Sequence, residues 1–136
     1  MNISSFDDLL QAARGQPDAQ RLLFVFTRVD APPPDALPQQ HAAYKEGRGG
    51  TLTPLACLDK TPDEIGTFDQ LNAEAIEHVP DWSIVFVAAL GGSPGQAPAS
   101  EQAETPLNSM VEMIKSGRID GLVPFDTNGD VLVFGR

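Results

Sequence analysis

The sequence predicts a single layered domain of α/β or α+β class, with about three apolar strands, a C-terminal hairpin and helices packed on the sheet. Three observations predict it: short β-rich apolar segments, one-faced helical segments between them, and an Asn-Gly pair between two apolar runs near the end. The chain has 136 residues, of which 41% are hydrophobic and 21% charged. Because this size can bury a core without disulfides or a structural metal, we expect one domain over residues 1–136.

The first element is a helix that begins after Ser4 or Ser5. A serine hydroxyl there can cap free backbone amides, and Asp7 and Asp8 are favourable in the first turn. Gly15 ends the helix. Its apolar residues recur at intervals of three and four and form one stripe: Phe6, Leu9, Leu10 and Ala13.

Three segments are predicted to be strands because they are short and rich in apolar, β-branched or aromatic residues. Residues 21–29 have a continuous apolar centre, which is typical of a strand covered on both faces. Residues 51–58 contain Pro54, which lacks an amide donor and indicates an edge position or a bulge. Residues 82–90 are apolar enough to be central in the sheet.

Two further helices carry clear start signals. Thr61 and Glu64 form a capping pattern around Pro62, and the pattern repeats from Thr67, so a short turn leads into a helix that runs to about Val79. The apolar face of this helix consists of Phe68, Leu71, Ala75 and Val79.

The last helix opens at Thr105 and Pro106 and is capped near Gly117. Its stripe consists of Leu107, Met110, Val111 and Ile114. The Asn128-Gly129 pair then predicts a hairpin turn.

Two connections are predicted to be mobile loops, at about residues 30–50 and 91–104. The first contains a proline run and a Gly-rich end, with a short helix between them. If the first three strands were parallel, their carboxyl ends would gather polar residues at one edge, where open α/β sheets bind ligands. Pro54 and the long connection between the first two strands favour antiparallel pairing of these strands about as strongly as parallel pairing is favoured. The residues of this possible cleft are Arg28, Asp30, His41, Tyr44, Arg48, Asp59 and Lys60.

Asp30 and Asp59 each follow a strand, where two carboxylates can act as acid and base or hold magnesium. Strand-terminal Asp is also common as a turn former, so we predict no catalytic residue from this pair. Cys57, inside an apolar strand, is interpreted as a small buried hydrophobe. With two His and one Cys in the chain, we predict no metal site and no cofactor.

The net charge of −10 argues against binding to nucleic acid phosphates or to an anionic membrane surface. Nine acidic residues and no Lys or Arg lie between residues 61 and 114. The exposed helix face formed by Asp69, Glu74 and Glu77 is therefore a candidate surface for a basic protein, although single-sign charge also serves solubility.

The polar, acidic start and the single Cys57 indicate the cytoplasm. The longest apolar run, 84–90, is far shorter than the ~20 residues that span a bilayer, so we expect no membrane association.

Four segments, at residues 4–28, 55–65, 81–90 and 110–126, together resemble a family of small uncharacterised bacterial proteins across nearly the whole chain. Some members of that family carry the label ribonucleotide reductase subunit alpha. The resemblance implies no functional residue, because the family has no established activity. Reductase alpha chains use several cysteines, and Cys57 alone cannot supply that chemistry.

The pattern as a whole favours a non-catalytic module that binds a basic protein surface or associates with itself as a homo-oligomer. The alternative is a small-molecule binder or an enzyme with a cleft near Asp30 and Asp59.

Overall fold

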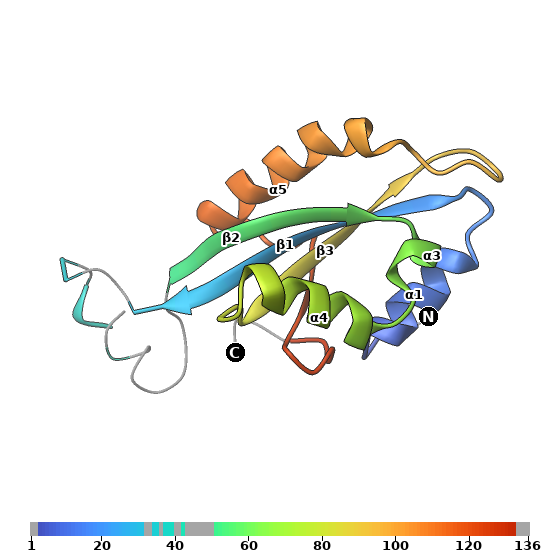
Figure 1. Ribbon diagram of the computed structural model, residues 1–136. Helices are drawn as coiled ribbons and strands as arrows, with labels where there is room; N and C mark the ends of the chain where they lie inside the picture. The colour runs from blue at the N-terminus through green and yellow to red at the C-terminus, as the bar shows by residue number, and fades with distance from the viewer. Residues whose placement is uncertain (1–2, 32–33, 36, 40–41, 43–50, 133–136) are drawn as a thin grey trace.

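The computed structural model describes residues 3–31, 34–35, 37–39, 42 and 51–132 (Figure 1). The elements follow in the order α1 (Phe6–Arg14), β1 (Gln20–Asp30), β2 (Thr51–Lys60), α3 (Pro62–Ile65), α4 (Phe68–His78), β3 (Ile84–Gly91), the 3₁₀ helix η1 (Ser100–Ala103), α5 (Glu104–Lys115) and β4 (Val123–Phe125). They form one four-stranded sheet with helices packed against it, so the predicted layered fold is confirmed.

The strand order is β2-β1-β3-β4, and every neighbouring pair is antiparallel. The carboxyl ends of β2 and β3 therefore lie beside the amino end of β1, which we call the Arg21 end of the sheet. The opposite end, where β1 finishes, is the Arg28 end. The central strands β1 and β3 contain the continuous buried runs of the sheet, as expected for strands with neighbours on both sides.

Pro54 marks both an edge strand and a bulge. β2 pairs with β1 alone and is the first strand of the sheet. The register shifts between Phe26, which lies opposite Ala56, and Thr27, which lies opposite Pro54, so that Leu55 is the extra residue. Pro54 was predicted to mark an edge strand or a bulge, and both features are present.

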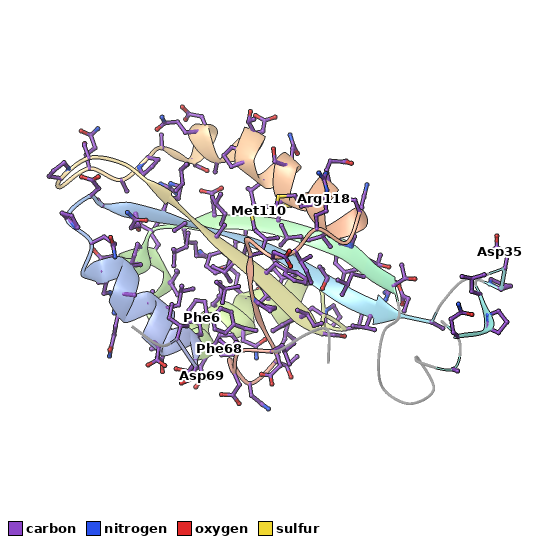
Figure 2. The ribbon with its side chains drawn as sticks, turned by 180° about the vertical axis from the view of Figure 1, so that it is seen from behind. Phe6, Asp35, Phe68, Asp69, Met110 and Arg118 are labelled. Carbon is purple, nitrogen blue, oxygen red and sulfur yellow. The ribbon has the colours of Figure 1, made fainter. Side chains whose placement is uncertain are left out.

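Alternate residues of the sheet face two separate apolar cores. On one face, α1, α3 and α4 cover Phe24 and Phe26, and the ring of Phe6 lies 5.3 Å from that of Phe68 and 5.5 Å from that of Phe125. On the other face, α5 covers Leu23 and Val25. Figure 2 shows the two layers, with Phe6 and Phe68 on one side of the sheet and Met110 on the other.

The helix starts follow their caps. Ser5, Thr61 and Thr67 each accept a hydrogen bond from a backbone amide three residues later and form capping boxes. The last helix differs from its prediction: α5 begins one residue earlier than Thr105, directly after η1. The segment 91–104, predicted as a mobile loop, therefore includes a helical turn, and its Ala103 is fully buried in the α5 core.

The chain closes the β4 edge of the sheet with its own C-terminal turn. Residues 126–130 reverse the chain, and Phe125 forms a bridge with Val131. Gly129 lies at φ 83°, in the left-handed region that favours glycine. The amide of Val131 donates to the carbonyl of Ser4, which ties both ends of the described chain together and confirms the predicted reversal at Asn128-Gly129.

Candidate functional site

The structure separates the two carboxylates of the predicted cleft. Leu23 of β1 lies opposite Asp59, whereas Asp30 lies opposite Thr51. Seven residues of extended chain, about 24 Å at 3.4 Å per residue, therefore separate Asp30 from the level of Asp59. Of the two pairings that the sequence left open, the antiparallel one is observed, and the shared site that parallel strands would have formed is not present.

At the Arg28 end, one cation lies between two carboxylates. Arg28 donates from Nε to Asp30 Oδ1 at 2.8 Å and from Nη1 to Asp81 Oδ2 at 2.7 Å, and Thr53 Oγ1 donates to Asp30 Oδ2 at 2.6 Å. The hydrogen bonds from Arg28 lower the pKa of both Asp30 and Asp81, and those with Asp30 and Asp81 raise the pKa of Arg28. These exposed groups stay ionised and neutralise one another in part, so they join β1 and β2 to the turn that precedes β3.

Three other residues of the predicted cleft, His41, Tyr44 and Arg48, lie outside the described residues.

At the Arg21 end, the largely buried side chain of Arg21 joins several segments that sequence reasoning did not connect. Arg21 Nη1 lies 2.7 Å from Asp59 Oδ1 and 3.7 Å from Glu64 Oε1, and its Nε donates to the Pro98 carbonyl at 2.6 Å. Ser100 Oγ donates to the second oxygen of Asp59 at 3.0 Å. Asp59 is thus a structural anchor for the segment before α5. The only sequence signal for Arg21 was a cation at the start of an apolar strand.

Lys60 is adjacent to Asp59 but faces the other side of the sheet. Its Nζ lies 3.0 Å from Glu74 Oε1 on α4. Successive strand residues point to opposite faces, so Asp59 and Lys60 cannot line one cleft. The four described members of the predicted set are therefore divided between the two sheet ends, and Asp59 and Lys60 lie on opposite faces.

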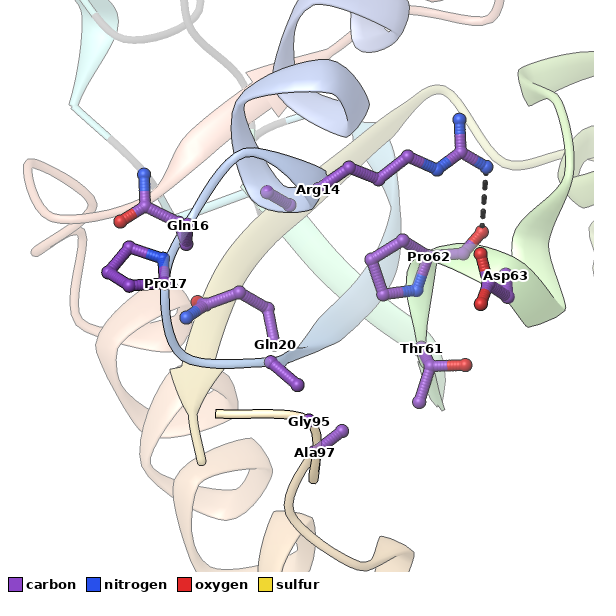
Figure 3. A pocket seen from close by; sticks show the side chains of 11 residues that line it. Arg14, Gln16, Pro17, Gln20, Thr61, Pro62, Asp63, Gly95 and Ala97 are labelled. Atoms are coloured by element: carbon purple, nitrogen blue, oxygen red, sulfur yellow. Dashed lines mark hydrogen bonds between the residues drawn. The ribbon is translucent and has the colours of Figure 1, made fainter. Parts of the chain in front are cut away.

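A hollow of about 550 Å³ does exist at the Arg21 end, but none of the four described residues of the predicted cleft lines it. It lies between the end of α1, the start of α3 and the loop before η1 (Figure 3). Arg14 on one wall donates from Nη2 to the Pro62 carbonyl on another at 3.3 Å. Its other polar lining side chains are Gln16, Gln20, Thr61 and Asp63.

The three acidic residues of α4 that the sequence singled out differ in their surroundings. Asp69 and Glu77 are exposed, and Glu74 is half-buried by its pairing with Lys60. Figure 2 shows Asp69 at the outer surface of the helix layer. One of the three charges is therefore compensated within the chain, and the other two face solvent.

A second hollow, of about 200 Å³, runs between α4 and β2, and we call it the edge groove. Its residues come from the two elements and the strand behind them: Phe26, Ala56, Cys57, Leu58, Glu74, Ala75, His78 and Val79. Cys57 is exposed, so its interpretation as a buried hydrophobe is wrong. The reason is that β2 has no neighbour on its outer side within the described chain. Partial burial still raises the pKa of the Cys57 thiol.

Within the described ranges, no helix is long and apolar enough to cross a membrane. The same ranges bring together no group of three or more His, Cys, Asp or Glu side chains that could hold a metal ion.

Comparison of the chain with protein-family models, with curated proteins and with solved structures finds no match. The functional argument therefore rests on the geometry of this chain.

Proposed function

We propose that this protein is a protein-interaction module that acts by binding rather than by catalysis, and that β2 accepts an extended segment of a partner as an additional strand. The observation that supports this function is the open outer edge of β2. This ten-residue strand pairs with β1 alone among the described residues, and an apolar groove runs beside it. An open edge offers rows of backbone donors and acceptors, and strand addition is a common way in which proteins use them.

The bulge restricts where a partner strand can pair. Pro54 has no amide to donate, and Leu55 is displaced from the regular register. From Ala56 to Lys60 the strand is in unbroken register with β1, so its outward backbone groups are regularly spaced. The proposed docking stretch is therefore Ala56–Lys60, with the edge groove along one side of it.

The exposed thiol of Cys57 supports a reducing compartment, and we propose the cytoplasm as the place of this interaction.

The experiment selects peptides from a random displayed library against the full chain and measures whether each selected peptide protects Cys57 from alkylation. Cys57 lies in the docking stretch, so a peptide paired with β2 is expected to slow alkylation at least about tenfold. The matched control is a peptide of the same composition in scrambled order. Failure to select any peptide, or selection of peptides that bind without protecting Cys57, would overturn the proposal.

A small-molecule site in the hollow beside Arg14 is the second candidate. Its volume of about 550 Å³ is in the usual range for ligand pockets, and its polar lining converges from three elements. A fragment screen that follows the amide signals of the chain tests this candidate. Shifts confined to the hollow and abolished by Arg14→Ala would favour it over strand addition.

A further inference from the structure

We infer that the partner segment is basic and carries one large apolar side chain, and that it comes from a different protein rather than from a second copy of this chain. The inference rests on the proposed function, since it names the chemistry of the segment that pairs with Ala56–Lys60. Two properties of the surroundings carry it, the apolar lining of the edge groove and the sign of the charges beside it.

The groove selects an apolar side chain of limited size. Its floor and walls include Phe26, Leu58, Ala75 and Val79, which are apolar. Its volume of about 200 Å³ equals the share of roughly seven water molecules in the liquid, which is room for one large side chain. In an added strand every second side chain points to the α4 face, so a single position of the segment would face the groove while its neighbours flank it.

The charges beside the groove select a basic segment. Glu74 lines the groove and Glu77 is exposed on the same helix. Among the described residues, Lys60 lies 3.0 Å from Glu74 and compensates part of its charge, so the uncompensated charge on this side is that of Glu77. The sequence from residue 61 to residue 114 contains no Lys or Arg that could neutralise it. A Lys or Arg in the flanking positions of the segment would meet carboxylates, whereas an Asp or Glu there would be repelled.

The same charges disfavour self-association through this edge. Two copies that paired β2 with β2 in antiparallel fashion would have their α4 helices on the same face of the joined sheet, one on each side of the symmetry axis. Glu74 and Glu77 of one copy would then approach the same residues of the other. Each copy also carries a net charge of −10, so approach is opposed at long range as well.

The test measures binding of four synthetic extended peptides to the full chain by fluorescence anisotropy. The parent peptide alternates Thr and Val around one central Phe and has Lys in the flanking positions. One derivative replaces the lysines with glutamates, the second replaces Phe with Ala, and the third contains a central Pro. We expect the parent to bind best, and each derivative to lose at least about tenfold in affinity. Raising the salt to about 0.5 M should weaken the parent peptide, because exposed charges are then screened.

The variant of the chain that tests the charges is the double substitution Glu74→Gln and Glu77→Gln, which should weaken binding of the lysine peptide about tenfold. The control is Glu101→Gln with Glu112→Gln, which removes the same charge from exposed residues of η1 and α5 and should leave the affinity unchanged.

The two proposals fail differently. If lysine and glutamate peptides protect Cys57 equally, the basic partner is overturned while strand addition to β2 stands. If no peptide of the set protects Cys57, and library selection also yields none that does, strand addition itself is overturned. Sedimentation velocity of the free chain tests whether two copies pair through β2. A dimer that dissociates when Cys57 is alkylated would contradict the inference.

Discussion

The two edges of the sheet differ in how the chain treats them. At one edge, β4 is three residues long and is covered by the C-terminal turn, through the bridge between Phe125 and Val131. At the other edge, β2 is ten residues long and has no further strand beside it in the described chain. Figure 1 shows β2 as the outer strand, with α5 and α4 on its two faces.

Among the described residues, segments 4–6 and 129–132 close the β4 edge, whereas the β2 edge is protected only in part. Ser4 accepts a hydrogen bond from Val131, and the Phe6 amide donates to the Gly129 carbonyl at 2.7 Å, so both ends of the described chain lock the β4 side. Pro54 and its bulge disturb the first half of β2, as is usual for an exposed edge. The second half keeps regular pairing geometry, which is where we place the partner.

The largest expected effect comes from removing the main apolar contact of the closed edge. Phe125 is fully buried against Phe6, so Phe125→Ala should lower the free energy of unfolding by about 3–5 kcal/mol. The matched change in the open edge, Leu58→Ala, removes a side chain that is only partly buried and should cost about 1–2 kcal/mol. Urea unfolding measures both. Equal costs would mean that the two edges are equally integrated in the core.

A smaller loss is expected at the turn that covers β4. Gly129→Ala combines the strain of φ 83° with a Cβ that would lie 3.1 Å from the ring of Phe68, and should cost about 2 kcal/mol. Gly117→Ala is the control, since its φ is 76° but no heavy atom lies within 4 Å of the added carbon, and it should cost about 1 kcal/mol. A thermal melt of each variant gives the comparison. If Gly117→Ala were the more costly change, crowding against Phe68 would not be the cause.

The stability of the closed edge should depend on pH through Asp8, because Asp8 accepts hydrogen bonds from Ser4 and Ser4 is bonded to Val131. Hydrogen bonds from the backbone and side chain of Ser4 lower the pKa of Asp8 below its usual 3.8. A carboxylate with a lowered folded pKa stabilises the fold above the unfolded value, and this stability is lost as the pH falls through the folded pKa. Thermal melts between about pH 5 and pH 2 should therefore show a steeper decline for the natural chain than for Asp8→Asn. Parallel curves would rule out this contribution of Asp8.

The smallest expected effect is on the alkylation rate of Cys57, which lies in β2 at the open edge. Burial raises the pKa of Cys57 above its usual 9.0, and the thiolate is the reactive form. Alkylation at pH 7 should be slower than that of the unfolded chain and should rise with pH beyond pH 9. A rate at pH 7 above that of the unfolded chain would show that the thiol is activated rather than suppressed.

Local signals predicted most of the elements because their causes lie within a few residues. The capping boxes at Ser5, Thr61 and Thr67 depend on a side chain and an amide three positions apart, and all three are formed. Pro54 identified an edge and a bulge because a missing amide has the same consequence in any sheet.

The candidate site was harder to predict because it depends on which strands pair and in which direction. Asp30 and Asp59 each lie at the carboxyl end of their own strand. The antiparallel pairing of β1 with β2 places them at opposite ends of the sheet. Arg21 joins Asp59 and Pro98, which are 38 and 77 residues away, and no local pattern records such a link. Exposure of Cys57 follows from the absence of a fifth strand beside β2 in the described chain, which its apolar neighbours in sequence do not reveal.

The most direct test of the open edge is amide hydrogen exchange at individual residues of β2, with and without the lysine peptide that has a central phenylalanine. The outward amides of Ala56–Lys60 should exchange quickly in the free chain, and the bound peptide should slow them at least about tenfold while the amides of β3 and β4 keep their rates. Slow exchange of these amides in the free chain, or protection that falls on the hollow beside Arg14 instead, would contradict the account.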